Sequence, residues 1–237
     1  MTFLETLVQK GREAGLFFNE RQLWQFEHYF EMLIETNKFM NLTAITDPEE
    51  VAVKHVIDSL LVYDQKIFPG KSLADVGTGA GFPGIPLKIY CPSLKVVLLD
   101  SLSKRLRFLE NCISELGLED ISCVHLRAED AGRNKTHREQ YDIVTARAVA
   151  RLAVLAEYCL PLVKVGGSFL ALKGSKYKEE VEEASKAFVL LGGEIKSAVE
   201  VRLPGLDDGR AIVSIVKKRP TPANYPRKAG LPEKQPL

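Results

Sequence analysis

The sequence predicts an α/β fold in which a mostly parallel, seven-stranded sheet carries helices on both faces and follows a small helical cap. Apolar strand-like runs alternate with helix-like runs between residues 71 and 191, which is the pattern of parallel βαβ units. A glycine-rich turn follows the first strand-like run. Two β-rich runs then end the alternation without a helix between them, which favours an antiparallel pair at one edge of the sheet.

Residues 1–65 are expected to form the helical cap. Apolar residues repeat at helical spacing in two stretches, comprising Leu23, Phe26, Phe30, Leu33 and Ile34, then Val53, Val56, Leu60 and Leu61. Between them, Asp47 is a candidate N-cap, with Pro48 in the first turn and Glu50 at the third position of the second helix. Trp24 and the phenylalanines of this region are expected in the core rather than on a base-stacking surface.

Residues 66–218 are expected to form the sheet domain. The predicted strands are 72–76, 95–100, 122–126, 141–145 and 168–173, and the predicted helices are 83–90, 104–116, 152–163 and 178–191. The antiparallel edge pair is predicted at 195–201 and 211–216.

Residues 219–237 are expected to form a basic, proline-rich arm. From Lys217 to the end there are six basic residues and one acidic residue, whereas the whole chain carries a net charge of only +1. Five prolines in the last 19 residues oppose regular structure. The sequence therefore predicts an extended arm or a disordered tail that contacts phosphates.

Composition and hydropathy restrict the class of protein. No stretch reaches the ~18 apolar residues of a membrane span, and Glu5 interrupts the segment where a secretion signal would lie. The four cysteines lack both C-x-x-C pairing and histidine neighbours at metal spacing. We therefore expect a cytoplasmic, monomeric protein with reduced thiols, no structural metal and no membrane partner.

The glycine-rich turn SLADVGTGAGFPG is the strongest sign of a ligand site. Gly77, Gly79 and Gly81 can take positive φ and bring the backbone close to a ligand, and the predicted helix that follows presents unpaired N–H groups. Together with the strand before it, this turn predicts a nucleotide-cofactor loop.

Two cofactors compete for this loop. Gly79, Gly81 and Gly84 also fit the G-x-G-x-x-G pattern of dinucleotide-binding folds. Asp75 separates the two, because a carboxylate beside the loop would repel a pyrophosphate and attract a sulfonium or ammonium group. S-adenosylmethionine is favoured over NAD, and Asp100, at the end of the second strand, is the expected acceptor for the ribose hydroxyls.

Other candidate residues follow the carboxyl ends of the later strands, where ligands bind in such sheets. Backbone amides and an acid in the segment 127–130 could frame an adenine ring. Arg147, Arg151 and Lys173 follow the fourth and fifth strands, and their donors suit guanine O6 and nearby phosphates. We interpret Arg147 and Lys173 as groups that orient the reacting base.

The absence of two motifs reduces the number of possible target atoms for methylation. No Asp/Asn/Ser-Pro-Pro-aromatic run and no Pro-Cys nucleophile follow the fourth strand, which disfavours exocyclic amines and pyrimidine C5 as targets. A ring nitrogen such as guanine N7 already has a free lone pair and needs neither a base nor a covalent intermediate. In the cap, Asn41, His55 and Asp58 either bond locally or line a substrate entrance.

At these residues the chain resembles the bacterial small-subunit rRNA guanine-N7 methyltransferases, once called glucose-inhibited division protein B. The matching stretches are NLTAITDP, KHVIDSL, ADVGTGAGFPGIPLKI, LLDSLSKRLRFL, VTARAVA, ALKG and YPRKAGLPEKQPL. The resemblance implies a Rossmann-like S-adenosylmethionine-dependent methyltransferase that acts on a guanine in a decoding-region loop of 16S rRNA, as RNA or within the small ribosomal subunit.

The same resemblance implies roles for individual residues. It implies cofactor contacts at Gly77, Phe82, Ala128, Glu129 and Arg147. It also implies substrate-side roles for Asn41, His55, Asp58 and Lys173. The alternatives left open are a small-molecule methyltransferase, an NAD-dependent oxidoreductase and a ribosome-binding module without activity.

Overall fold

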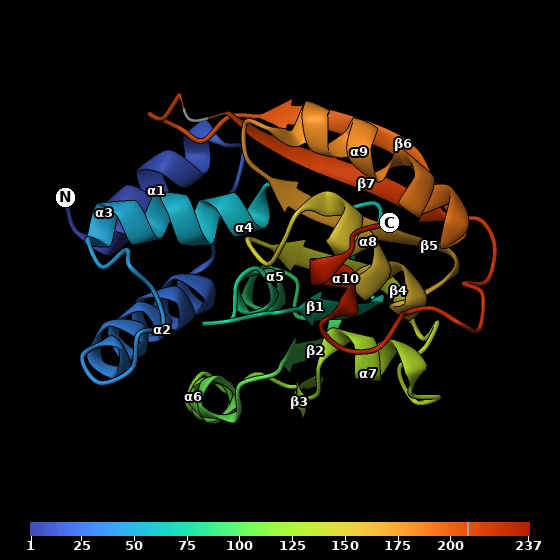
Figure 1. Cartoon of the computed structure of the whole chain (residues 1–237). Coiled ribbons are helices and arrows are strands. Elements are labelled where there is room, and N and C mark those ends of the chain that lie inside the picture. Colours follow the sequence, from blue (N-terminus) through green and yellow to red (C-terminus); the bar gives the residue numbers. More distant parts are fainter. Residues whose placement is uncertain (208) are drawn as a thin grey trace.

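A computed structural model describes residues 1–207 and 209–237, and it contains one seven-stranded sheet with the order β3-β2-β1-β4-β5-β7-β6. All neighbouring strands are parallel except β7, which runs antiparallel to both β5 and β6. The strands are β1 Ser72–Val76, β2 Lys95–Asp100, β3 Ile121–His125, β4 Tyr141–Arg147, β5 Val163–Lys173, β6 Gly193–Val201 and β7 Arg210–Lys217. The predicted fold class and the antiparallel edge pair are confirmed (Figure 1).

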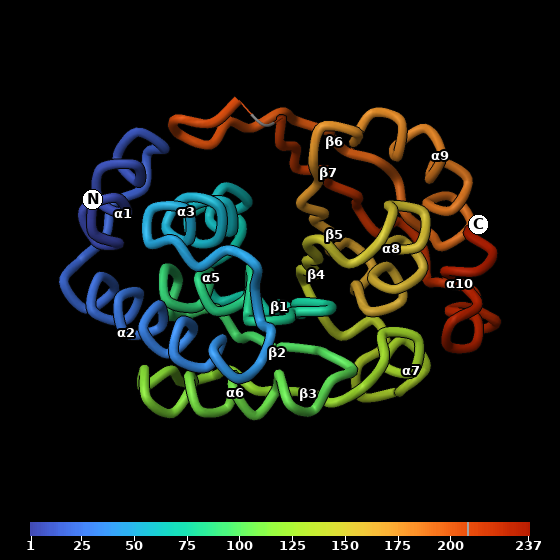
Figure 2. The backbone as a smooth tube through the Cα atoms, turned by 60° about the vertical axis from the view of Figure 1, so that its left-hand side comes forward, coloured from blue at the N-terminus to red at the C-terminus, as the bar shows by residue number. Residues whose placement is uncertain are grey.

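Helices cover both faces of the sheet. Their bounds are α1 Phe3–Glu13, α2 Glu20–Asn37, α3 Pro48–Val51, a π-helical turn η1 Ala52–Ile57, α4 Asp58–Leu60, α5 Gly84–Tyr90, α6 Ser103–Glu115, α7 Ala128–Arg133, α8 Leu152–Cys159, a 3₁₀ turn η2 Leu160–Leu162, α9 Tyr177–Leu190 and α10 Leu231–Lys234. Figure 2 shows α1 to α6 on one side of the sheet and α7 to α10 on the other. Each side has its own hydrophobic core.

The N-terminal cap shares a core with the sheet. Phe26 and Tyr29 of α2 are buried in the same cluster as Leu73 of β1 and Leu98 of β2. The Asp47 side chain accepts a hydrogen bond from the Glu50 amide, so the predicted N-cap is confirmed. The boundaries at residues 65 and 218 stay a prediction, since the cap and the sheet are packed as one body.

Aromatic residues of the cap divide between core and surface. Phe26 is buried as expected, but Trp24 is 52% exposed and stacks on His28. Phe39, just after α2, is 86% exposed. Phe17 is also exposed, at 71%. The expectation of a core position is therefore wrong for Trp24, which lies off the apolar stripe by which α2 faces the sheet, and for Phe17 and Phe39, which lie outside α1 and α2.

The C-terminal tail is ordered and packed against the domain, which corrects the predicted extended or disordered arm. Its Arg227 forms a bidentate ion pair with Glu157 of α8, which is fully buried. Arg138 donates to the carbonyl oxygens of Thr221 and Tyr225. These backbone carbonyls, which proline-rich sequence leaves without helix or sheet partners, are satisfied by arginine side chains instead.

Only some of the basic residues of the tail face solvent. Lys217 is fully buried and donates to the Leu160 carbonyl and the Thr221 hydroxyl. The charge of Arg227 is neutralised by Glu157. The exposed basic residues are Lys218, Arg219, Lys228 and Lys234.

Cys91, Cys112, Cys123 and Cys159 are all free thiols. Within residues 1–207 and 209–237, no helix combines the length and the apolar character that crossing a bilayer requires.

Candidate active site

The glycine loop between β1 and α5 has the predicted backbone geometry. Gly77, Gly79 and Gly81 have φ of +68°, +61° and +105°, a region that favours glycine. A Cβ at Gly77 would lie 2.6 Å from a methyl carbon of Val149. A side chain at that position would therefore collide with the segment after β4, which closes over the loop.

Asp75 lies beneath this loop and holds it from below. Its Oδ2 accepts hydrogen bonds from the Thr78 hydroxyl at 2.6 Å and from the Gly84 amide at 2.9 Å, so one carboxylate oxygen joins both ends of the turn. Its side chain is fully buried. Its other oxygen, Oδ1, is buried and has no hydrogen-bond partner among the described residues, and the expected contact of Asp75 with the cofactor stays a prediction.

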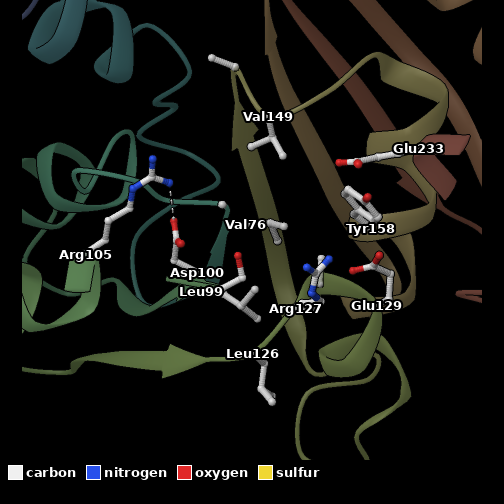
Figure 3. Close-up of a pocket in the computed structure, with 14 residues that line it drawn as sticks. Val76, Leu99, Asp100, Arg105, Leu126, Arg127, Glu129, Val149, Tyr158 and Glu233 are labelled. Carbon is white, nitrogen blue, oxygen red and sulfur yellow. Dashed lines mark ion pairs between the residues drawn. The ribbon is translucent and has the colours of Figure 1, made fainter. Parts of the chain in front are cut away.

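A cavity of about 280 Å³ opens above the glycine loop (Figure 3). We call it the loop cavity, and its lining residues are Val76, Gly77, Leu99, Asp100, Ser101, Arg105, Leu126, Arg127, Ala128, Glu129, Ala148, Val149, Tyr158 and Glu233. Of the predicted cofactor residues, Gly77, Asp100, Ala128 and Glu129 are among them. The strand ends thus bring together residues 52 positions apart in the chain, as the parallel topology predicts.

Asp100 has a fixed position in this cavity. Its Oδ2 accepts from the Gly79 amide at 3.0 Å and lies 3.6 Å from Arg105, while its Oδ1 accepts from the Leu102 amide at 2.9 Å. These bonds orient the buried carboxylate at the carboxyl end of β2. Each oxygen keeps a lone pair for another donor.

Ala128 and Glu129 begin α7, a helix that the sequence analysis missed. The Glu129 carboxylate accepts a hydrogen bond from the Gly230 amide in the tail at 2.8 Å. Gly79, Gly81 and Phe82 lie in the loop and α5 region but do not line the loop cavity. Phe82 instead stacks on His55, with ring centroids 4.6 Å apart.

A second, smaller cavity of about 130 Å³ lies on the other side of the β4 end. We call it the Arg147 cavity, and its lining residues are Asp58, Leu61, Arg147, Ala148, Leu172, Lys173, Gly174, Glu180, Val201, Arg210, Ala211 and Ile212. Ala148 lines both cavities and has a positive φ of 55°. Such a backbone turn is uncommon for alanine and redirects the chain between the two cavities.

Arg147 connects the sheet to the cap. Its Nη1 donates to Asp58 at 2.7 Å and to the Lys54 carbonyl at 3.1 Å, and its guanidinium carbon lies 5.1 Å from the Phe82 ring centroid. Its Nη2 lies 3.5 Å from His55 Nδ1. Three residues predicted separately, Arg147, His55 and Asp58, therefore form one cluster.

Lys173 and Arg151 differ in their surroundings. Lys173 is within 2.7 Å of Glu180 and donates to the Ala150 carbonyl, so it lies inside the Arg147 cavity. Arg151 is exposed and paired with Glu183 of α9, outside both cavities. Asn41 is exposed on the segment between α2 and α3. Thr43 of the same segment bonds His55 Nε2 at 2.7 Å.

Several residues that line these cavities were not predicted from the sequence, including Arg105 and the following four. Glu180 and Arg210 complete the ionic lining of the Arg147 cavity, and Tyr158 and Glu233 close the loop cavity. Glu180 is in the first turn of α9 and caps the Leu152 amide of α8. None of the four directly follows a parallel strand, so the strand-end rule could not find them.

Two titratable groups near the site have pKa values shifted in opposite directions. Burial raises the pKa of Asp75 from 3.8 to about 6, although hydrogen bonds from Thr78 and Gly84 lower it. Burial and then the charge of Arg147 lower the pKa of His55 from 6.5 to about 4. Between pH 4 and 6, folded Asp75 retains a proton that the unfolded chain releases, so its contribution to stability falls as pH rises. In the same pH range, His55 is unprotonated in the folded protein and protonated in the unfolded chain. Its contribution to stability therefore falls as the pH drops.

In wild-type protein, the opposite pH dependences of the Asp75 and His55 contributions to the free energy of unfolding should largely cancel. A variant that lacks one of the two groups should show the pH dependence of the other. Wild type loses the Asp75 contribution as the pH rises from 4 to 7, and Asp75→Asn does not. The free energy of unfolding of Asp75→Asn minus that of wild type should therefore rise by about 3 kcal/mol over this pH range. Wild type gains the His55 contribution over the same rise in pH, so the free energy of unfolding of His55→Gln minus that of wild type should fall. Urea denaturation at several pH values measures both differences. Differences that do not change with pH would contradict this account.

Residues 22–206 match the family model described as rRNA small subunit methyltransferase G. The ribosomal RNA small subunit methyltransferase G of Lactobacillus johnsonii is 51% identical over 236 residues, which is 98% of this chain and 99% of that protein.

Solved structures share the fold at low sequence identity. A SAM-dependent methyltransferase from Aquifex aeolicus aligns with a TM-score of 0.56 at 16% identity, over 74% of this chain and 97% of that one. Aeropyrum pernix fibrillarin, crystallised with natively bound S-adenosyl-L-methionine, aligns with a TM-score of 0.51 at 16% identity, over 68% and 72% of the two chains. The methyltransferase fold and the family predicted from the motifs are confirmed, and the chain belongs to the rRNA small subunit methyltransferase G family.

Proposed function

We propose that this protein transfers the methyl group of S-adenosylmethionine to N7 of a guanine in a decoding-region loop of 16S rRNA. The observation that carries the proposal is the placement of two cavities on either side of Ala148, at the carboxyl end of β4. The loop cavity suits the cofactor, and the Arg147 cavity suits a polar base. A methyl group at the boundary between them would face the base.

The residues of the loop cavity fit S-adenosylmethionine. Gly77 lines the cavity without a side chain, and the oriented Asp100 carboxylate can accept both ribose hydroxyls. Val76 and Leu99 offer apolar walls. A cavity of this size is near the lower end of the range for small-molecule sites. When bound, the cofactor supplies an electrophilic methyl group on a positively charged sulfur.

The chemistry requires positioning rather than proton transfer. The N7 lone pair of guanine forms the bond to the methyl carbon as the carbon–sulfur bond breaks, and the positive charge passes to the base. No proton leaves guanine, so no general base is needed. A low pKa keeps His55 neutral, which agrees with a packing and orienting role for this residue beside Phe82.

The ionic lining of the Arg147 cavity is suited to hold guanine. Arg147, Lys173 and Arg210 supply donors for O6, which lies beside N7 on the same edge of the base. Asp58 and Glu180 hold two of these cations in place at 2.7 Å. We assign Arg147 and Lys173 to the orientation of the base, with Asp58 as a positioning residue.

The RNA partner requires contacts beyond one base. We assign phosphate contacts to the exposed basic residues of the tail, because half or more of the hydrogen bonds in nucleic-acid complexes reach the backbone. Asn41 and Arg151 are exposed and remain candidates for substrate contact. Lys217 and Arg227 are not candidates, because their charged groups are bonded inside the protein.

The function is tested by methyl transfer from labelled S-adenosylmethionine to small-subunit RNA and to small subunits lacking the modification. Mass spectrometry of the nucleosides should identify 7-methylguanosine. Comparing protein-free RNA with intact subunits distinguishes the two physical forms of the substrate. Cofactor binding without methylation of either substrate would contradict the proposal and favour a small-molecule acceptor.

Asp100→Ala is expected to weaken cofactor binding about a hundredfold. The charged acceptor of two hydroxyl groups is lost, and a hydrogen bond to a charged group contributes about 1.5–3 kcal/mol. Isothermal titration with S-adenosylhomocysteine measures the change. Asp100→Asn keeps one oxygen acceptor and should show a smaller loss. Unchanged affinity in Asp100→Ala would show that the ribose lies elsewhere.

A further inference from the structure

One wall of the loop cavity comes from the C-terminal tail. Glu233, in the short helix α10, lines the cavity together with Tyr158 of α8 and with Ala128 and Glu129 of α7. Figure 3 shows Glu233, Tyr158 and Glu129 on the side of the cavity opposite Asp100. The family model matches only as far as residue 206, so this wall lies beyond the matched region.

Internal bonds hold the tail at this position. Arg227 is bonded to Glu157, and the Arg227 amide also donates to that carboxylate at 2.7 Å. Three residues further on, the Gly230 amide donates to Glu129. Pro232 is buried next to Glu233. Glu233 therefore extends from a backbone that is anchored on both α7 and α8.

The carboxylates of Glu129 and Glu233 differ in their hydrogen bonding and in their exposure. One oxygen of Glu129 is occupied by the tail backbone, and the residue is 3% exposed. Glu233 is exposed on the cavity side, and in the described part of the chain it takes part in no ion pair. Glu233 is therefore the more exposed of the two carboxylates at this end of the cavity.

Tyr158 lies beside Glu233 in the lining of the cavity. Burial first, then the negative charges of Glu129 and Glu233, raise the pKa of Tyr158, so the tyrosine keeps its proton at neutral pH. The carboxylate of Glu233 has lone pairs for an N–H donor of a ligand.

We propose that Glu233 accepts a hydrogen bond from the exocyclic amine of the cofactor's adenine, which would lie at the end of the cavity lined by Tyr158 and Glu233. The inference rests on the proposed function, since it assumes S-adenosylmethionine in the loop cavity. Gly77 and Asp100 occupy the methionine and ribose end, which leaves the α7 end for adenine. The amine is the N–H donor on the adenine ring, and a carboxylate can only accept, so the two match.

The proposal is tested with two ligands that differ at this group. S-Adenosylhomocysteine carries the amine, whereas S-inosylhomocysteine carries a carbonyl oxygen there. Wild type should bind the adenosyl ligand more tightly, because Glu233 would face the inosyl oxygen without a proton between them. Glu233→Gln should bind the adenosyl ligand about tenfold more weakly and the inosyl ligand more tightly, since the glutamine amide can donate. Isothermal titration measures the ratio of the two affinities.

Asp130→Asn is the matched control. Asp130 is exposed on α7, next to Glu129, and does not line the cavity, so its variant removes the same charge and should keep the wild-type ratio. An unchanged ratio in Glu233→Gln, with S-adenosylhomocysteine still bound, would overturn this proposal alone. If wild type bound neither ligand, the proposed function would fail, and this proposal with it.

Discussion

Arg227→Ala should reduce the free energy of unfolding by about 3–5 kcal/mol, which is the usual loss when one partner of a buried ion pair is removed. Glu157 is fully buried in α8, and Arg227 is the cation paired with it. The variant leaves that carboxylate in an apolar core with the Arg227 backbone amide as its remaining donor. Urea denaturation at pH 7 measures the change.

Two further variants separate the buried charge from the loss of tail contacts. Lys228→Ala removes an exposed neighbouring cation and should change stability by less than about 0.5 kcal/mol. Adding Glu157→Gln to Arg227→Ala should restore part of the loss, since a neutral amide is less costly to bury. If the double variant were as unstable as the sum of both single variants, the penalty would not arise from the unpaired charge.

The tail shows where sequence reasoning stops. Proline content and positive charge correctly predict the absence of long helices and strands between residues 219 and 237. They do not reveal that Arg227 bonds to Glu157, 70 positions earlier, or that the Gly230 amide bonds to Glu129, 101 positions earlier. Local patterns report backbone preference, whereas these bonds depend on which surfaces the finished sheet brings together.

The site follows the same division. The strand-end rule predicted Asp100, Ala128, Glu129, Arg147 and Lys173 at one edge of the sheet, and these five line one of the two cavities. Arg151, which the same rule predicted, lies outside both cavities. The rule predicts at which edge of the sheet a residue lies, but not which groups its side chain contacts. Asp75 is at the same edge, and its Oδ2 atom accepts bonds from the Thr78 hydroxyl and the Gly84 amide within the glycine turn, contacts that strand order alone does not predict.

Arg147→Ala is expected to lower the rate of methyl transfer about a hundredfold, the order of loss that follows from misplacing reacting groups by about 1 Å. Arg147 joins Asp58, the Lys54 carbonyl and the face of Phe82, and it lines the Arg147 cavity. Without it, the cap loses these contacts with the end of β4, and guanine loses a donor. The loss should fall on kcat more than on cofactor affinity, because Arg147 does not line the loop cavity.

A double-mutant cycle with Asp58→Asn distinguishes orientation of the base from support of the cap. If Asp58 acts only by holding Arg147, the double variant should be no slower than Arg147→Ala, and the coupling energy should be large. Arg147→Lys should recover little, because a single ammonium cannot reproduce the planar set of contacts to Asp58, Lys54 and Phe82. Arg12→Ala, an exposed arginine of α1, controls for loss of positive charge. Full activity in Arg147→Ala at a temperature where it remains folded would remove this residue from catalysis and leave Lys173 and Arg210 as the donors of the cavity.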